Sequence, residues 1–173
     1  MFKILPKTFY ERNTLIVSQE LLGKVLCFGN IEARIIETEA YVGEDDPACH
    51  AAKGITPRTK IMYGSAGHAY VYLIYGMYYC LNIVTEKQGF PAAVLIRGVY
   101  QYSPLQVLLD GPGKLCRTLG INKTQNGQDV TSNKSFCIID VGNTPKFIST
   151  PRIGISKGTD RLWRYLEIDL FRN

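Results

Sequence analysis

Apolar side chains recur at helical spacing near the start of the chain. Residues 14–22 have the sequence TLIVSQELL, which predicts a short helix with its apolar positions on one side. Asn13 or Thr14 stands at its start, and residues of this kind cap helices through a side-chain oxygen. Gly23 follows, a common residue just beyond a helix end. We therefore expect the first helix to end at or before Gly23.

A hairpin is predicted directly after this helix. Residues 24–28 and 32–42 are rich in apolar residues, and Gly29-Asn30 between them is a two-residue hairpin sequence. Side chains alternate between the two faces of a strand. One face of the return strand is expected to carry Ile35, Glu37, Glu39 and Tyr41. Two carboxylates beside an aromatic ring are unusual on a face that packs a core.

The rest of the chain predicts further strands and one more helix. The expected strands are residues 69–75, 78–85, 92–99, 135–140, 152–156 and 164–170, and the expected helix is residues 113–120. The first three of these strands would form an antiparallel meander. Residues 44–67 are rich in Asp, Pro and Gly and are expected to be mostly loop. No repeat or linker divides the chain, so residues 1–173 are expected to form a single α+β domain, a curved antiparallel sheet or partly open barrel with small surrounding helices.

Composition excludes several classes of protein. With 46% apolar and 20% charged residues, the chain is neither disordered nor fibrous. It has no run of the roughly 18 apolar residues that a membrane span needs, and its first residues lack the apolar core of a signal peptide. Five widely spaced cysteines and two histidines favour reduced thiols in a cytoplasmic protein over a zinc site or a disulfide framework. The net charge of +5 is a mild excess that would help an encounter with a polyanion.

Tyrosine is the residue type with the most uneven distribution. Six of the eleven tyrosines lie within residues 63–79, where an ordinary core would use Leu, Ile, Val and Phe. This stretch belongs to an acid-free run, residues 47–85, that follows an acidic cluster over residues 32–46. We therefore expect an anion-binding surface on the acid-free run and on the last third of the chain.

Four features of the pattern combine into one candidate site. They are the Glu39–Tyr41 pair, His50 in the following loop, the tyrosines from Tyr72 to Tyr78 around Gly76, and the polar residues Asn82 and Arg97 inside apolar strands. Singly, each has an ordinary explanation: Glu39 can be a solvated strand residue, Arg97 an ion-pair partner of Glu37 or Glu39, and tyrosines are good strand formers. Together they fit a pocket in which aromatic faces stack on a planar ring and a carboxylate activates water. That combination indicates hydrolysis at a base–sugar bond.

Five long segments then identify a family. In order from about residue 14 to residue 165 they include RIIETEAYVGEDDPACHA, GHAYVYLIYGMYYCLNIVT, AAVLIRG, GPGKLCRTLGI and PRIGIS. Together they resemble the alkyladenine (3-methyladenine) DNA glycosylase family of base-excision repair. The resemblance implies a fold like the C-terminal domain of formyltransferases. It also implies a monomeric, monofunctional enzyme without metal or organic cofactor, which acts on double-stranded DNA containing damaged purines, in the cytoplasm or on the nucleoid.

The resemblance also assigns expected roles to individual residues. Glu39 matches the general base and Arg97 the arginine that helps to position the attacking water. Tyr41, His50 and Tyr72 match residues that line the base pocket, and Asn82 matches the asparagine that excludes the exocyclic amine of normal guanine. Tyr75 matches the side chain inserted through the minor groove, with Met77 and Tyr78 beside it. Expected phosphate contacts are Arg58, Lys60, Lys114 and Arg117, with Lys53 and Arg161 or Arg164 as further candidates.

Two alternatives remain open at this stage. A nucleic-acid-binding module without catalytic activity would keep the stacking tyrosines, but it would not need Glu39 together with Arg97. A related domain that binds tRNA, as in formyltransferases, would not need Tyr41, His50 and Tyr72 as a set.

The segment Arg58-Thr59-Lys60 departs from the Arg-Asn pair that is usual in the family, so we expect a local difference in that loop.

Overall fold

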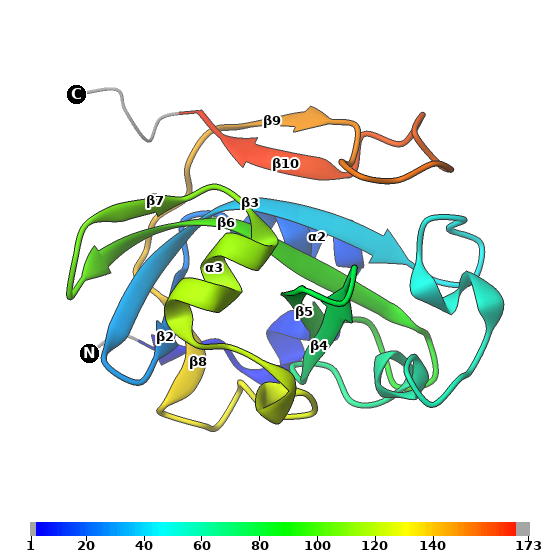
Figure 1. The fold of residues 1–173 in the computed structure, drawn as a ribbon, viewed down its shortest axis with the longest axis horizontal. Coiled ribbons are helices and arrows are strands. Elements are labelled where there is room, and N and C mark those ends of the chain that lie inside the picture. The colour runs from blue at the N-terminus through cyan, green and yellow to red at the C-terminus, as the bar shows by residue number, and fades with distance from the viewer. Residues whose placement is uncertain (1–2, 169–173) are drawn as a thin grey trace.

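Two strands of 12 residues each, β3 (Ile31–Val42) and β6 (Ala92–Ser103), pair antiparallel at the centre of the fold. The computed structural model describes residues 3–168, and in it both strands belong to one antiparallel sheet that curls into a half-barrel (Figure 1). The order along the sheet is β1-β8-β2-β3-β6-β5-β4, with β7 beside β6 and the β9–β10 pair beside β3. The other strands are β1 (Lys3–Ile4), β2 (Val25–Phe28), β4 (Ala69–Ile74), β5 (Tyr78–Val84), β7 (Val107–Leu109), β8 (Phe136–Asp140), β9 (Phe147–Thr150) and β10 (Arg164–Glu167). The predicted α+β fold on a curved antiparallel sheet is confirmed.

Within residues 3–168, three short α-helices accompany the sheet: α1 (Lys7–Tyr10), α2 (Thr14–Glu20) and α3 (Pro112–Leu119). The predicted cap of α2 is confirmed, because the Asn13 side chain accepts hydrogen bonds from the N–H groups of the first helical turn. In the view of Figure 1, α3 lies in front of β6 and α2 lies behind β3. The loop between β3 and β4 holds two single-turn 3₁₀ helices, His50–Lys53 and Lys60–Tyr63, and a third covers Lys123–Gln125.

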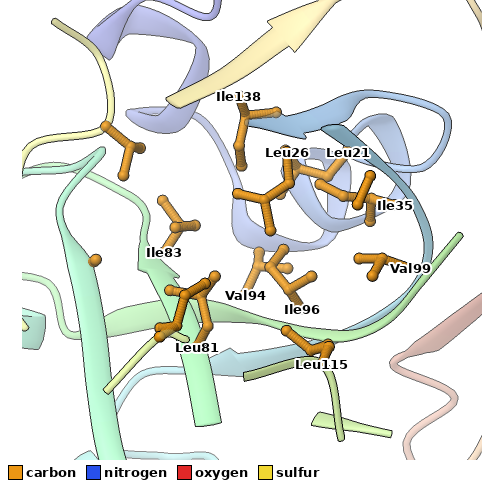
Figure 2. Close-up of a cluster of buried hydrophobic side chains, with 14 of the residues drawn as sticks. Leu21, Leu26, Ile35, Leu81, Ile83, Val94, Ile96, Val99, Leu115 and Ile138 are labelled. Carbon is orange, nitrogen blue, oxygen red and sulfur yellow. The ribbon is translucent and has the colours of Figure 1, made fainter. Parts of the chain in front are cut away.

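A β-bulge in β3 corrects the predicted distribution of its side chains. The register against β6 shifts on either side of Glu37, so the alternation of faces is interrupted there. Before the bulge, Ile35 packs in the main core with Leu21, just after α2 (Figure 2). After it, Thr38 bonds to Ser18 of α2, which turns Glu37 and Glu39 to the opposite side. Strict alternation predicted that Ile35 shares a face with Glu37 and Glu39. That prediction is wrong, because the bulge places Ile35 on the core side and the two carboxylates on the other side.

The core occupies the concave space between α2, the central strands and α3. Figure 2 shows side chains from β2, β3, β5, β6, β8 and α3 meeting there; the labelled residues are Leu21, Leu26, Ile35, Leu81, Ile83, Val94, Ile96, Val99, Leu115 and Ile138. A second, smaller cluster contains Met62, Tyr70, Val84 and Ala93 and supports the other side of β4 and β5. The tyrosine-rich strands β4 and β5 are thus packed on both faces, against the main core on one side and the smaller cluster on the other.

The predicted strand over residues 152–156 is wrong. Arg152 is buried and donates hydrogen bonds to Asp46, and the N–H of Ile153 donates to a side chain instead of a strand partner. The strand in this region is β9, which ends just before Pro151. The final predicted strand, 164–170, is observed as Arg164–Glu167, and its last two residues lie outside the described residues.

The buried hydroxyl pair between α2 and β3 generates a stability prediction. Ser18 Oγ donates to Thr38 Oγ1 at 3.0 Å, and Thr38 Oγ1 donates to the Ser18 carbonyl at 2.8 Å. Thr38→Val keeps the shape but leaves both Ser18 groups unpaired, so the free energy of unfolding should fall by about 1–3 kcal/mol in urea titrations. Adding Ser18→Ala should recover part of that loss, whereas equal losses in the single and double variants would contradict the pairing.

Candidate active site

A cavity of about 580 Å³ lies where β3, β4, β5 and β6 meet the start of α3 and the segment after β9. Its volume is within the range of small-molecule sites, and most of its wall is apolar or aromatic. Among the residues that line it are Glu39, Tyr41, His50, Tyr72, Tyr75, Tyr78, Asn82, Arg97, Lys114 and Arg117. The structure therefore brings most of the predicted site residues to one cavity.

Glu39 is fully buried at the wall of this cavity, and both of its carboxylate oxygens are hydrogen-bonded. Tyr41 Oη donates to Oε2 at 2.7 Å, and the backbone N–H of Ile153 donates to Oε1 at 2.8 Å. Burial raises the pKa of the Glu39 carboxyl above its ordinary value, while these two bonds and the charge of Arg97 lower it again in part. The group is held in one orientation and has a raised affinity for a proton.

Arg97 lies closer to Glu37 than to Glu39. Its Nε is 2.9 Å from Glu37 Oε1 and 3.8 Å from Glu39 Oε1. The same Glu37 oxygen accepts a hydrogen bond from Arg164 Nε at 2.6 Å, so one buried carboxylate serves two arginines. Arg97 is thus an ion-pair partner of Glu37 first, and it reaches the cavity beside Glu39.

Three aromatic side chains in mutual contact, His50, Tyr70 and Tyr72, form another part of the cavity wall. The rings of His50 and Tyr72 meet edge to face at a centroid distance of 4.6 Å, and the rings of Tyr70 and Tyr72 are 5.3 Å apart. His50 Nδ1 is 2.9 Å from Tyr70 Oη. Burial, together with the positive charges of Arg58 and Lys53, lowers the pKa of His50 to about 4. The imidazole is therefore neutral at physiological pH and is oriented by Tyr70.

One arginine lies over the Tyr72 ring and another over the Tyr41 ring. Neither arginine lines the cavity. The guanidinium carbon of Arg58 is 4.8 Å from the centre of the Tyr72 ring, and that of Arg152 is 4.7 Å from the centre of the Tyr41 ring. Arg58, predicted as a phosphate contact, is exposed, lies over the Tyr72 ring outside the cavity lining, and makes a long hydrogen bond of 3.5 Å to the Leu73 carbonyl. The neighbouring Thr59 is buried, and its hydroxyl bonds within its own loop to Gly54 and Thr56.

Asn82 is buried at the cavity wall with its amide held by the backbone. Its Nδ2 donates to the Tyr70 carbonyl at 3.1 Å and to the Cys80 carbonyl at 3.4 Å. These bonds leave Oδ1 as the polar atom available to the cavity. Asn82 is thus fixed in place and lines the cavity together with Leu95, its partner on β6.

The tip of the β4–β5 hairpin carries the most exposed aromatic side chain of the site. Tyr75 and Gly76 both have positive φ, 53° and 65°, as a type I′ hairpin turn requires at its two central positions. Positive φ is uncommon for tyrosine, because Cβ crowds the backbone there. Tyr75 is 79% exposed and Met77 is 65% exposed. The turn therefore presents large apolar side chains to solvent at the edge of the cavity.

The first turn of α3 fits closely against this hairpin. A Cβ at Gly113 would lie 2.8 Å from the Cβ of Tyr78, so only glycine permits the contact. Lys114 and Arg117 follow on α3, both exposed and both at the cavity edge, with Lys114 paired to Asp110. Lys53 and Lys60 are exposed on the β3–β4 loop, whereas Arg161 and Arg164 are engaged within the protein with Asp46 and Glu37.

Sequence reasoning missed several groups that shape the site. Tyr70 was not among the predicted site residues, yet it lines the cavity and bonds to His50. Its place two residues before Tyr72, on the same face of one strand, was an available signal. The Ile153 N–H and the Arg152–Asp46 ion pair left no local signal, because they join segments more than 100 residues apart. Within residues 3–168, no three His, Cys, Asp or Glu side chains are grouped to hold a metal ion, and no helix is long and apolar enough to cross a membrane.

Comparisons with known proteins identify the family of the chain. The family model described as Methylpurine-DNA glycosylase (MPG) matches residues 8–169. Provisionally named 3-methyladenine DNA glycosylases from Sodalis glossinidius and Rickettsia felis are each 58% identical to the chain, over 94% and 98% of its length and 95% and 96% of their own. A relative of the same name from Wolbachia pipientis wMel is 58% identical over 94% of the chain and 90% of its own length. The chain belongs to the methylpurine-DNA glycosylase family, whose members are hydrolases of N-glycosyl bonds.

Proposed function

We propose that the protein flips alkylated or deaminated purine nucleotides out of duplex DNA and hydrolyses the N-glycosyl bond with a water activated by Glu39, leaving an abasic site. The substrate class includes 3-methyladenine, 7-methylguanine, hypoxanthine and ethenoadenine. The observation that carries the proposal is a buried carboxylate, fixed through both oxygens, in an aromatic cavity beside an arginine. In this proposal the protein acts as a monomer on cellular DNA, in the cytoplasm or on the nucleoid.

Glu39 suits the role of general base. A base must be ionised and within hydrogen-bond reach of the water, and its efficiency improves as its pKa approaches the working pH. The raised pKa of Glu39 moves it in that direction, while the Tyr41 and Ile153 bonds keep an ionised form accessible. Cleavage develops positive charge on the sugar, which a nearby carboxylate also stabilises. Arg97 would then orient the water and the carboxylate from the Glu37 side.

The aromatic cavity suits a damaged purine. Stacking of a base on an aromatic side chain contributes about 1–3 kcal/mol and is open to any base with a π face. N3- and N7-alkylated purines are cationic, and the neutral state of His50 avoids repelling them. Asn82, fixed by two backbone carbonyls and so unable to turn aside, would occupy the space that the exocyclic amine of undamaged guanine needs.

The exposed hairpin tip suits the extrusion step. A base inside a duplex must leave the stack before chemistry, at a cost of a few kcal/mol that is smaller for damaged or mismatched bases. Tyr75, with Met77 and Tyr78 beside it, would fill the gap and repay part of that cost. Lys114 and Arg117 at the cavity edge, with Arg58, Lys60 and Lys53 on the β3–β4 loop, are the proposed phosphate contacts.

A catalytically inactive nucleic-acid-binding module is the alternative. Such a module gains nothing from burying a carboxylate among aromatic rings, because an unused buried charge only costs stability. The fixed Glu39 therefore favours the enzyme.

Replacing Glu39 by glutamine tests the role of the base. The amide keeps the shape of the side chain but cannot act as a general base, so single-turnover release of hypoxanthine from a duplex should fall at least 10²-fold, while the affinity for the lesion duplex is kept. The matched control is Glu32→Gln, an exposed glutamate on the same strand, which should leave the rate unchanged. Equal losses of rate and affinity in Glu39→Gln would contradict the assignment.

The same substitution should stabilise the folded protein at neutral and alkaline pH. A carboxyl whose folded pKa is raised favours folding only while protonated, and that contribution is lost as the pH rises through the folded pKa. Above that pKa, Glu39→Gln removes the cost of a buried charge, so its Tm should exceed that of the unmodified protein at pH 8. The difference should shrink toward pH 4, and a gap that widens on acidification would refute the raised pKa.

Tyr75→Ser tests the inserted side chain. Without the tyrosine the vacated stack stays unfilled, so the rate of hypoxanthine release from a paired site should fall about 10-fold or more. Release from an unpaired site should fall less, because less stacking is lost. Tyr102→Ser, an exposed tyrosine on β6 outside the cavity lining, is the control and should change neither rate. Equal effects of Tyr75→Ser on paired and unpaired sites would count against insertion.

Asn82→Ser tests the exclusion of guanine. The shorter side chain leaves room for an exocyclic amine, so slow release of guanine from undamaged duplex DNA should become measurable. Release of hypoxanthine, which lacks that amine, should change less. An unchanged guanine rate in a variant that still releases hypoxanthine would remove this role from Asn82.

A further inference from the structure

A buried ion pair lies directly behind the proposed active site. Arg152 Nη1 donates to Asp46 Oδ2 at 2.6 Å and Arg152 Nη2 donates to Asp46 Oδ1 at 2.8 Å, with both side chains fully buried. Although burial alone would raise it, the hydrogen bonds from Arg152 hold the pKa of Asp46 below its ordinary value. A bidentate arginine–carboxylate pair has a fixed geometry, so it can hold the segments that carry its two residues in a fixed relative position.

This ion pair joins three segments of the chain. Arg152 Nη1 also donates to the Ala40 carbonyl at 2.9 Å, on the strand position beside Glu39. Asp46 accepts hydrogen bonds from the N–H groups of Val42 and Ala48, which ties down the loop that leads to His50. The third segment is the one that contains Arg152 itself. The position of the next residue, Ile153, is therefore set relative to β3 by the guanidinium.

Both hydrogen-bond donors to Glu39 are in contact with Arg152 or adjacent to it. The Ile153 N–H, which donates to Oε1, follows Arg152 directly in the chain. The Tyr41 ring, whose hydroxyl donates to Oε2, lies 4.7 Å from the Arg152 guanidinium carbon. The Trp163 ring lies 5.1 Å from the same carbon, so the guanidinium contacts two aromatic rings. Lysine offers neither the planar fork nor the flat faces that this arrangement uses.

We propose that Arg152 is a positioning residue for base release, which aligns the Ile153 amide and the Tyr41 hydroxyl on the Glu39 carboxylate without touching the substrate. The proposal rests on the proposed function of Glu39. It predicts that the ionisation of Glu39 in the working enzyme depends on Arg152.

Several charged and titratable groups surround Glu39 and bear on that ionisation. They come from every element packed against it: Glu37 and Tyr41 on β3, Cys80 on β5, Arg97 on β6, Arg164 on β10, and Arg152 after β9. Arg152 is already neutralised by Asp46, with Arg161 Nη1 3.6 Å from the same carboxylate. Loss of Arg152 should therefore act on Glu39 mainly through the two hydrogen bonds. Both of these bonds lower its pKa, so their loosening should raise the pKa further.

The test is the pH profile of single-turnover hypoxanthine release by Arg152→Lys and by the double variant Arg152→Met/Asp46→Asn. The double variant leaves no unpaired buried charge, and the asparagine that replaces Asp46 can still accept from the backbone, which protects folding. In both variants the acidic limb of the profile should move to higher pH by about one unit, since a lost hydrogen bond to a charged group is of that size. The plateau rate should fall about 10-fold, less than the roughly 10²-fold or more that loss of a transition-state donor costs, because the two bonds to Glu39 are loosened and not removed. The affinity for the lesion duplex should change much less.

Arg161→Lys is the matched control. Arg161 also contacts Asp46 and the Trp163 ring, but it is adjacent to neither of the groups that donate to Glu39. The acidic limb of the pH profile of Arg161→Lys should therefore not move. A role of Arg152 in stability alone would lower the Tm or the active fraction without moving the limb, and that result would overturn the proposal. Failure of the proposed function would be seen in a different result, namely that Glu39→Gln still releases hypoxanthine. In that case the acidic limb of the pH profile does not report the ionisation of Glu39.

Discussion

The site depends on two hydrogen bonds to one buried carboxylate. Glu39 has no exposed surface, and a carboxylate without partners in such a place would be neutral at physiological pH. The Tyr41 hydroxyl and the Ile153 N–H each satisfy one oxygen, so the ionised form is kept available without exposure to bulk water. Much of the architecture around the cavity supplies or supports these two donors.

Charge is balanced around this carboxylate in two layers. Nearest the cavity, Glu37 takes the closer contact of Arg97 and also pairs with Arg164, which leaves Arg97 as a partial partner of Glu39. Behind it, Asp46 neutralises Arg152, so a guanidinium can stack on Tyr41 without adding a net charge next to the cavity. This arrangement suits a site that binds cationic purines, because the arginines that build it are paired with acids. Arg58, over the Tyr72 ring, is exposed to solvent, and its charge helps to keep the His50 imidazole neutral.

The features predictable from the sequence were those encoded locally. The cap at Asn13, the Gly29-Asn30 hairpin and the meander of β4, β5 and β6 follow from short-range patterns, and each is observed. The positions of Glu39 and Asn82 at the cavity wall were also expected, Glu39 from its pairing with Tyr41 on one strand face and Asn82 as a polar residue inside an apolar strand. The predictions that were wrong concern features that depend on contacts between segments distant in the sequence. The bulge at Glu37 depends on pairing with β6, and residues 152–156 look like a strand only until the Arg152–Asp46 contact is known. An alternating pattern cannot reveal that an amide is used by a side chain more than 100 residues away.

The most direct measurement is a crystal structure of the Glu39→Gln variant with a duplex that contains one hypoxanthine. We expect an extrahelical hypoxanthine between Tyr41, His50 and Tyr72, with Tyr75 in the vacated stack. We also expect a water that bridges the substituted side chain at position 39 and the sugar C1′, at hydrogen-bond distance from that side chain, about 2.6–3.2 Å. A hypoxanthine bound in the cavity with residue 39 remote from C1′, or a duplex whose base remains stacked, would contradict the proposed function.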